Sequence, residues 1–219
     1  MEVSAKSYDY ITWKEAIKEC DTTVSLLNID IDESWTPIFE TLETLQTIAD
    51  RIVNDTHEGK VIYPYPGLLF KAFEQPLDKV RVVILGQDPY HGAETMYGEV
   101  VPQAMGLSFS VPTGLKIPSS LMNIYRNLIN FGHLKQMPSH GNLERLQDQG
   151  VLFLNSALSV VKATPNSHQA LWKRFTETMI KSLDSKDVIF VLWGRDAIDK
   201  GVSLKHSMAV RSSHPLLKM

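Results

Sequence analysis

Three side chains of different chemistry each stand just beyond a short apolar run of the sequence: Asp88, Asn155 and His214. A carboxylate can orient a water molecule or stabilise a developing cation, and an imidazole can donate a hydrogen bond to a developing anion. A side-chain amide can pair with one edge of a ring, on which an aromatic residue such as Phe109 can stack. These residue types predict a metal-free hydrolytic or lyase-type site for a planar, hydrogen-bonding ligand.

A purely structural interpretation exists for each of these residues. Asp88-Pro89 is also a common turn sequence, and an isolated histidine more often has a structural role than a catalytic one. A carboxylate, an amide and an imidazole at the ends of three strands favour a site. The seven histidines show no zinc-type spacing, and the single cysteine, Cys20, excludes a disulfide or a cysteine-ligated cluster within the chain. No metal and no cofactor is expected.

The elements that must position these side chains alternate between strand and helix. Apolar, mostly β-branched runs predict buried strands, and apolar residues spaced three and four apart predict amphipathic helices. Strands are expected at 81–86, 105–111, 151–154, 188–193 and 208–211, and helices at 119–129, 143–149 and 169–183. Residues 93–104 are expected to form an exposed loop. The alternation predicts a three-layer α/β/α fold around a small, mostly parallel, four-stranded twisted sheet, whose polar strand ends meet at one edge.

Length and composition fit a single domain spanning residues 1–219, with 43% apolar and 21% charged residues. Residues 1–58 are expected to be a helical part packed on the α/β core, because their apolar residues fall at helical spacing. The net charge of −3 excludes a broadly basic nucleic-acid binder. It still allows a locally positive groove, or phosphate contacts from hydroxyls and backbone amides.

No stretch of the sequence is long and apolar enough to cross a bilayer, and the first residues lack the pattern of a secretory signal. The protein is therefore expected to be intracellular and not associated with membranes. Two settings stay open, the cytoplasm of a bacterium and the nucleus in a eukaryotic or viral context.

Five motifs in one order resemble those of the uracil-DNA glycosylase family. They are Gly86–Gly92 (GQDPYHG), Gly106–Val111 (GLSFSV), Ile117–Leu121 (IPSSL), Val151–Ser156 (VLFLNS) and Ser213–Pro215 (SHP). The resemblance implies a DNA repair enzyme that flips uracil out of DNA and hydrolyses its N-glycosidic bond. The product is an abasic site, which initiates base excision repair. The resemblance also implies a monomer that acts on uracil in single- and double-stranded DNA.

The resemblance assigns the chemistry of bond cleavage to four of these residues. Asp88 is expected to position the attacking water and to stabilise the oxocarbenium-like sugar. His214 is expected to donate a hydrogen bond to uracil O2 as the leaving base becomes anionic. Gln87 is expected to bind the same oxygen through its backbone amide, and His91 to lie near the water.

The resemblance assigns base selection to three others. Phe109 is expected to stack on the flipped base, and Asn155 to pair with N3–H and O4 of uracil. Cytosine would leave two mismatched polar contacts at Asn155, and a site of this type discriminates by about 10⁴ to 10⁵. Tyr90 is expected to occupy the space that the 5-methyl group of thymine needs, and rigid packing makes that overlap costly.

DNA is expected to be held by small hydroxyl donors to phosphate, from Ser120 and from Ser212 or Ser213. Arg195 stands where the family often has serine, and its charge can replace a neutral phosphate contact. Residues 93–104 form a longer connection than is usual in the family. This insertion either alters DNA contacts or is an inert part of the surface.

The segment after His214 departs from the family pattern, since the chain continues as Pro215-Leu216-Leu217 and ends at Met219. Leu216 or Leu217 is expected to wedge into the base stack that uracil leaves. A shortened terminus predicts slower turnover on duplex DNA than on single strands, because a wedge matters most where a stack must be held open. It also motivates a second hypothesis, a catalytically weak uracil- or DNA-binding module or a replication-complex subunit on the same fold.

Overall fold

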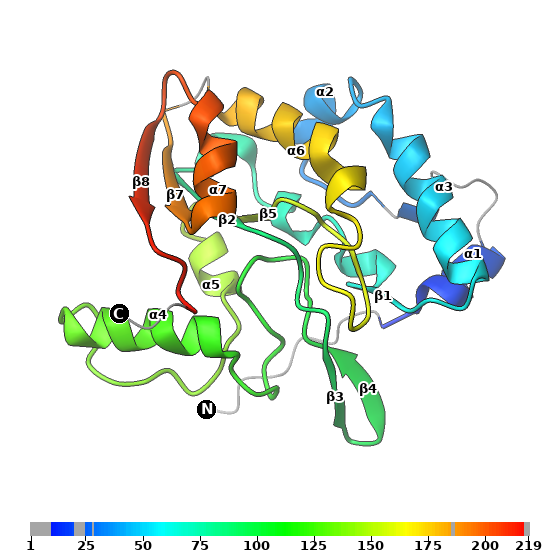
Figure 1. Ribbon diagram of the computed structural model, residues 1–219, viewed down its shortest axis with the longest axis horizontal. Coiled ribbons are helices and arrows are strands. Elements are labelled where there is room, and N and C mark those ends of the chain that lie inside the picture. Colours follow the sequence, from blue (N-terminus) through cyan, green and yellow to red (C-terminus); the bar gives the residue numbers. More distant parts are fainter. Residues whose placement is uncertain (1–9, 20–24, 28, 185–186, 217–219) are drawn as a thin grey trace.

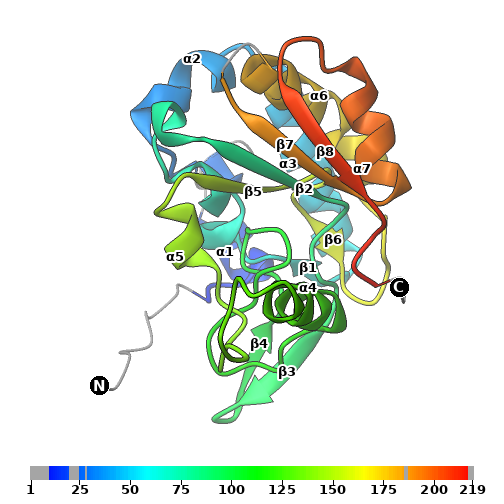
Figure 2. The same ribbon diagram turned by 90° about the vertical axis from the view of Figure 1, so that its left-hand side faces the viewer.

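The computed structural model describes residues 10–19, 25–27, 29–184 and 187–216. Its centre is a sheet of four parallel strands in the order β5 (Val151–Asn155), β2 (Val82–Gly86), β7 (Ile189–Trp193) and β8 (Met208–Ser212). Helices lie on both sides of this sheet, with α2 and α6 on one side and α4 on the other (Figures 1 and 2). The expected α/β fold around a four-stranded parallel sheet is confirmed.

The remaining elements surround this sheet. The helices are α1 (Trp13–Glu19), α2 (Thr36–Phe39), α3 (Thr44–His57), α4 (Ser119–Asn130), α5 (Glu144–Gln147), α6 (Gln169–Asp184) and α7 (Arg195–Lys200). Short 3-10 helices span Ser25–Leu27, Glu33–Trp35, Pro66–Leu68, Lys71–Phe73, Leu77–Lys79 and Gly201–Ser203. Two small antiparallel pairs join β1 (Ile62–Tyr63) to β6 (Val160–Val161) and β3 (Ala93–Met96) to β4 (Glu99–Pro102). The described part of residues 1–58 is mainly helical, and residues 1–9, 20–24 and 28 of that range lie outside the described residues.

The α6 side of the sheet is fully packed. Its strand residues are at most 1% exposed: Val83, Leu85, Leu152, Leu154, Phe190 and Leu192. Phe175 of α6 is 0% exposed and meets Phe39, Phe73 and Trp172 edge to face, at ring-centroid distances of 5.1 to 5.9 Å. Aromatic pairs in this geometry stabilise a core beyond the area that they bury. This side therefore forms the rigid base of the sheet.

The α4 side of the sheet is less closely packed. A cavity of about 700 Å³ is lined by Ile84 and Val191 of the sheet and by Ile124 and Leu128 of α4. Both sheet residues are consequently only half-buried. No helix among the described residues has the length and apolarity that crossing a bilayer requires.

Two expectations about the segment after β2 are wrong. Residues 93–104 were expected to be an exposed loop, but β3 and β4 pair as a hairpin over residues 93–102, and Tyr97 and Gly98 at its tip both have positive φ, of 53° and 85°. A two-residue turn with positive φ at both positions matches the twist of the two strands. Residues 105–111 do not form a strand, because Gly106 and Phe109 have φ of 79° and 63°, which interrupts an extended chain.

The aromatic packing under α6 leads to a stability prediction. Phe175→Ala should lower the free energy of unfolding by about 3–5 kcal/mol, because it removes a fully enclosed ring and leaves a cavity. Phe131→Ala is the matched control, since Phe131 is 74% exposed and its loss should change stability by no more than about 0.5 kcal/mol. Urea unfolding followed by circular dichroism measures both. Equal losses in the two variants would contradict the proposed core.

Candidate active site

The carboxyl ends of three parallel strands converge on one pocket of about 310 Å³. Asp88 follows β2, Asn155 is the last residue of β5, and His214 follows β8. All three line the pocket, together with other residues singled out from the sequence, namely Gln87, Tyr90, His91, Phe109, Ser120 and Leu216. The topology therefore brings the acid, the amide and the imidazole together from positions far apart in the sequence.

The carboxylate of Asp88 is half-buried and is held by the chain that precedes α6. Its Oδ2 accepts a hydrogen bond of 2.7 Å from the backbone N–H of Asn166. Burial raises the pKa of Asp88, while this N–H opposes the rise because it favours the charged carboxylate. Gln87 is tied to the same residue, since its Nε2 donates to Asn166 Oδ1 at 2.6 Å. The backbone oxygen of His91 accepts from the N–H of Ala163 at 3.0 Å.

The side chain of Asn155 lies directly over the backbone of Gly86. These two residues are register partners of β5 and β2, and a Cβ at position 86 would stand 2.2 Å from Asn155 Oδ1. Only glycine leaves room for the amide, which is 7% exposed and lines the pocket. The pocket is thus shaped to present an amide with both a donor and an acceptor.

Phe109 takes a left-handed backbone conformation, with φ of 63°, which is rare for an aromatic residue. Its backbone oxygen accepts a hydrogen bond of 3.3 Å from the hydroxyl of Tyr90. Burial raises the pKa of Tyr90, so its hydroxyl remains a donor at neutral pH. The ring of Phe109 contacts Trp193 at a centroid distance of 5.5 Å and His214 at 6.2 Å. Strain of this kind persists only where the surroundings enforce it, and it clusters at ligand sites.

The imidazole of His214 has a defined tautomer. Its Nδ1 accepts a hydrogen bond of 3.1 Å from the N–H of Leu216, so the proton of the neutral ring is on Nε2. Partial burial lowers the pKa of His214 below its ordinary value of 6.5. The following residue is fixed by Asn123, whose Nδ2 donates to the oxygen of Pro215 at 2.6 Å. His214 therefore offers a neutral N–H donor at neutral pH.

The serines expected to contact DNA lie partly in the pocket and partly outside it. Ser120 is 7% exposed and lines the pocket, and it does not cap α4, whose N-cap is Pro118. Ser212 and Ser213 are exposed and line the cavity beside α4.

The remaining candidates lie at the margin of the site. Arg195 is the exposed first residue of α7 and does not line the pocket. Leu216 is 57% exposed at the pocket, and Leu217 lies outside the described residues. No cluster of three or more potential metal ligands occurs among the residues that the structure describes.

Asn166 is a polar residue of the pocket that the sequence patterns did not single out. It follows β6 and binds both Asp88 and Gln87. Its contact with Asp88 comes from the backbone N–H, and a backbone contact cannot be predicted from the type of residue. The available signal is weak: asparagine tolerates positive φ well, and Asn166 stands three residues before a helical pattern.

Comparisons with known proteins agree with one another. Residues 73–217 match the family model of the uracil DNA glycosylase superfamily. The chain is 41% identical to a uracil-DNA glycosylase of Campylobacter lari, covering 93% of this chain and 80% of that protein. It is 39% identical to a uracil-DNA glycosylase of Helicobacter hepaticus, covering 88% and 86%.

Solved structures give the same result. The crystal structure of mimivirus uracil-DNA glycosylase is similar with a TM-score of 0.86 and 35% identity, covering 96% of this chain and 78% of that one. A variant of the mimivirus protein solved in complex with UGI is similar with a TM-score of 0.87 and 36% identity, covering 97% and 79%.

The environment of His214 predicts its titration. Its imidazole should lose its proton below the ordinary pKa of 6.5, because burial disfavours the cation, and it should carry its proton on Nε2 at neutral pH. Nitrogen-15 NMR of the imidazole side chains reports both quantities, and His214→Ala identifies the signal. A midpoint at or above 6.5, or a proton on Nδ1, would contradict this geometry.

Proposed function

The chain belongs to the uracil-DNA glycosylase superfamily, and from this premise we propose which residues of the pocket excise uracil from DNA. It is a DNA glycosylase, a hydrolase that cleaves the N-glycosidic bond of uracil in base excision repair. The convergence of Asp88, Asn155 and His214 on one pocket is the observation that carries the assignment of roles.

Asp88 orients the attacking water and stabilises the positive charge that develops on the sugar. The bond between C1′ and N1 of uracil breaks, the water oxygen bonds to C1′, and the proton that the water gives up passes through solvent to the uracil anion. An oxocarbenium-like sugar is favoured by a nearby negative charge. The hydrogen bond from Asn166 supports this role, because it stabilises the charged form of the carboxylate and fixes its direction.

His214 stabilises the leaving base. Uracil departs with negative charge shared between N1 and O2, and a neutral Nε2–H donates to O2. The bond from Leu216 to Nδ1 supports this role, since it leaves the proton on Nε2. A neutral donor is suited to this task, because it keeps its proton while the charge on the base develops. The backbone amide of Gln87 binds the same oxygen, and His91 lies beside the water.

Phe109, Asn155 and Tyr90 select the base. The ring of Phe109 stacks on uracil, and Asn155 accepts from N3–H and donates to O4. The rigid position of Asn155 over Gly86 supports discrimination, because the amide cannot turn freely to suit cytosine. Tyr90, anchored to the backbone of Phe109, excludes the methyl group of thymine by overlap.

The enzyme acts on uracil-containing DNA, and we infer that it does so as a monomer on single and double strands. Ser120, Ser212 and Ser213 donate to phosphates, and Arg195 adds one charged contact near the end of β7. Leu216, exposed at the rim of the pocket, enters the space that the flipped base leaves. Mostly neutral contacts suit a chain with a net charge of −3.

Loss of the Asp88 charge tests the assignment directly. Asp88→Asn should lower the rate of uracil release by roughly 10³-fold, because it removes the charge that stabilises the transition state. A uracil-containing oligonucleotide is incubated with protein and treated with alkali, and strand scission is measured by electrophoresis. Asp78→Asn, at an exposed aspartate of the 3-10 helix Leu77–Lys79, is the matched control and should keep full activity. No scission by the folded wild-type protein would refute the function.

Base selection is tested by changing the amide. Asn155→Asp should release cytosine from a cytosine-containing oligonucleotide, because a carboxylate accepts from the amino group that cytosine carries in place of O4. The wild-type protein and Asn54→Asp, a change at an exposed position of α3, should release uracil only. The free base is identified by chromatography. Unchanged selectivity in Asn155→Asp would show that another residue reads this edge of the ring.

A further inference from the structure

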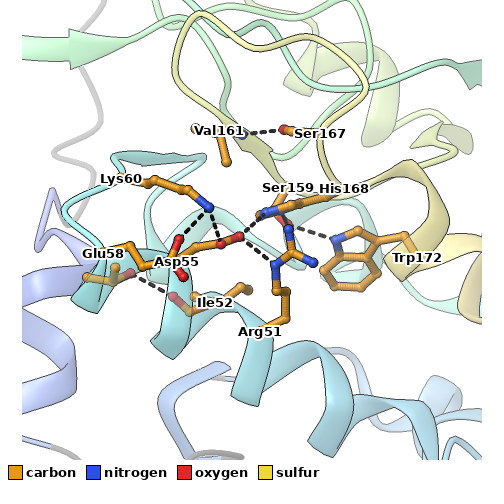
Figure 3. A network of polar contacts seen from close by, with 11 residues as sticks. Arg51, Ile52, Asp55, Glu58, Lys60, Ser159, Val161, Ser167, His168 and Trp172 are labelled. Atoms are coloured by element: carbon orange, nitrogen blue, oxygen red, sulfur yellow. Dashed lines mark hydrogen bonds and ion pairs between the residues drawn. The ribbon is translucent and has the colours of Figure 1, made fainter.

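A directional chain of hydrogen bonds is buried between α3 and α6 (Figure 3). Trp172 Nε1 donates to Ser159 Oγ at 2.8 Å, and Ser159 Oγ lies 2.8 Å from Nδ1 of His168. Nε2 of His168 lies 3.0 Å from Oδ2 of Asp55. Because indole can only donate, the serine hydroxyl donates onward to Nδ1, and the imidazole donates through Nε2 to the carboxylate.

This chain contains a serine, a histidine and an aspartate, but it cannot act as a nucleophilic site. Ser159 is 0% and His168 is 1% exposed, so no substrate reaches either residue. The carboxylate of Asp55 is balanced by Arg51 and Lys60 at 2.8 and 2.7 Å. Burial favours a higher pKa for Asp55, but its hydrogen bonds to Lys60, His168 and Arg51 outweigh burial and hold the pKa at about 2. A buried polar network in which every member is paired fixes one arrangement of the segments that it joins.

The segment that this network fixes is the Asn166 loop, residues Lys162–His168. His168 ends the loop and anchors it in the core. Inside the loop, Ser167 Oγ accepts from the N–H of Val161 at 2.8 Å, and the oxygen of Asn166 accepts from the N–H of Gln169 at 3.2 Å. The loop is thus a braced turn that leads into α6.

The other side of the Asn166 loop faces the catalytic pocket. Ala163 donates to the oxygen of His91, and Asn166 contacts both Asp88 and Gln87. The N–H of Asn166 reaches Asp88 because Asn166 has φ of 65°, a left-handed conformation that asparagine and glycine tolerate and β-branched residues do not. The loop therefore joins the buried network to the carboxylate at a single backbone donor.

We propose that Asn166 is a positioning residue for Asp88, and that the buried Asp55–His168 pair holds it in place. The inference rests on the proposed function of Asp88 in uracil excision. Asn166 acts on the reaction only through the direction and the charge of the carboxylate. Its left-handed backbone is the essential feature, and its side chain is secondary.

The pH dependence follows from the contacts of Asp88. Activity needs the charged carboxylate, so it falls as the pH drops through the pKa of Asp88. Burial raises this pKa, the Asn166 N–H lowers it, and two titratable groups face the carboxylate, His91 from its own loop and Asp196 from α7. Loss of the N–H contact raises the pKa, and the acidic limb of the rate profile then moves to higher pH.

A pair of variants separates the backbone from the side chain of Asn166. Asn166→Val disfavours positive φ and should lower kcat by roughly 10- to 100-fold, with KM changed by less than about threefold, because the carboxylate is misdirected and not removed. In this variant, the acidic limb of the profile of rate against pH should move to higher pH. Asn166→Gly keeps both the conformation and the N–H, and it should retain most of the wild-type kcat and pH profile. Urea unfolding checks that both variants are folded.

Carbon-13 NMR of the Asp88 carboxyl group gives a readout that does not need turnover. The pKa of Asp88 should be higher in Asn166→Val than in the wild type and in Asn166→Gly. This result would support the positioning role even if the wild-type protein released no uracil, in which case only the proposed function would fail. Wild-type values in Asn166→Val, or equal losses in Asn166→Val and Asn166→Gly, would overturn the inference.

A double-mutant cycle tests the anchor. His168→Leu should lower kcat in the wild-type background, but it should add little in the Asn166→Val background, where the donor is already displaced. Ser159→Ala offers a smaller perturbation of the same chain and should behave in the same way. Fully additive losses would show that the buried network does not act through Asn166.

Discussion

The close approach of Asn155 to Gly86 is the constraint on which the pocket depends. These two residues are paired in the register of β5 and β2, and the amide occupies the space that any Cβ at position 86 would fill. A shift of the register by one residue would turn every side chain of β5 to the opposite face of the sheet. The register therefore places the amide beside the loop that begins with Gln87 and Asp88, and it fixes both on one rigid pair of strands.

The sequence predicted the parts of the fold that depend on local patterns. The apolar runs at 81–86, 151–154, 188–193 and 208–211 became the four parallel strands, as apolar runs that alternate with helical patterns predict. The hairpin at 93–102 was missed, because its turn is Tyr97-Gly98 and not one of the asparagine-glycine or aspartate-glycine pairs that are typical of a tight turn.

The sequence patterns singled out the pocket residues that offer reactive side chains and missed one that contributes a backbone N–H. Asp88, Asn155 and His214 can be recognised from the sequence, because each is a polar residue at or just beyond the end of a predicted strand. Asn166 contributes an N–H that every residue but proline has, and only its φ makes it special. The left-handed conformation of Phe109 could not be predicted either, because phenylalanine has no propensity for it and the Tyr90 hydroxyl that holds the Phe109 oxygen comes from a distant part of the chain.

The two outer edges of the four-stranded sheet differ in how far they are covered. The outer edge of β5 is covered, since Ser108 donates to the oxygen of Phe153 and Gln75 donates to the oxygen of Val151. β8 is an edge strand whose outward residues Met208 and Val210 are 67% and 50% exposed. Segments with few buried apolar contacts open at lower free energy than the core.

His214 therefore stands at the end of the least buried strand of the sheet and depends on a few local contacts. Asn123 binds the following residue, and Gly194 leaves room for the imidazole, since a Cβ there would stand 2.9 Å from the Cβ of His214. The amide of Asn155 is thus positioned by the core of the sheet, whereas the imidazole of His214 is positioned by short contacts at the edge.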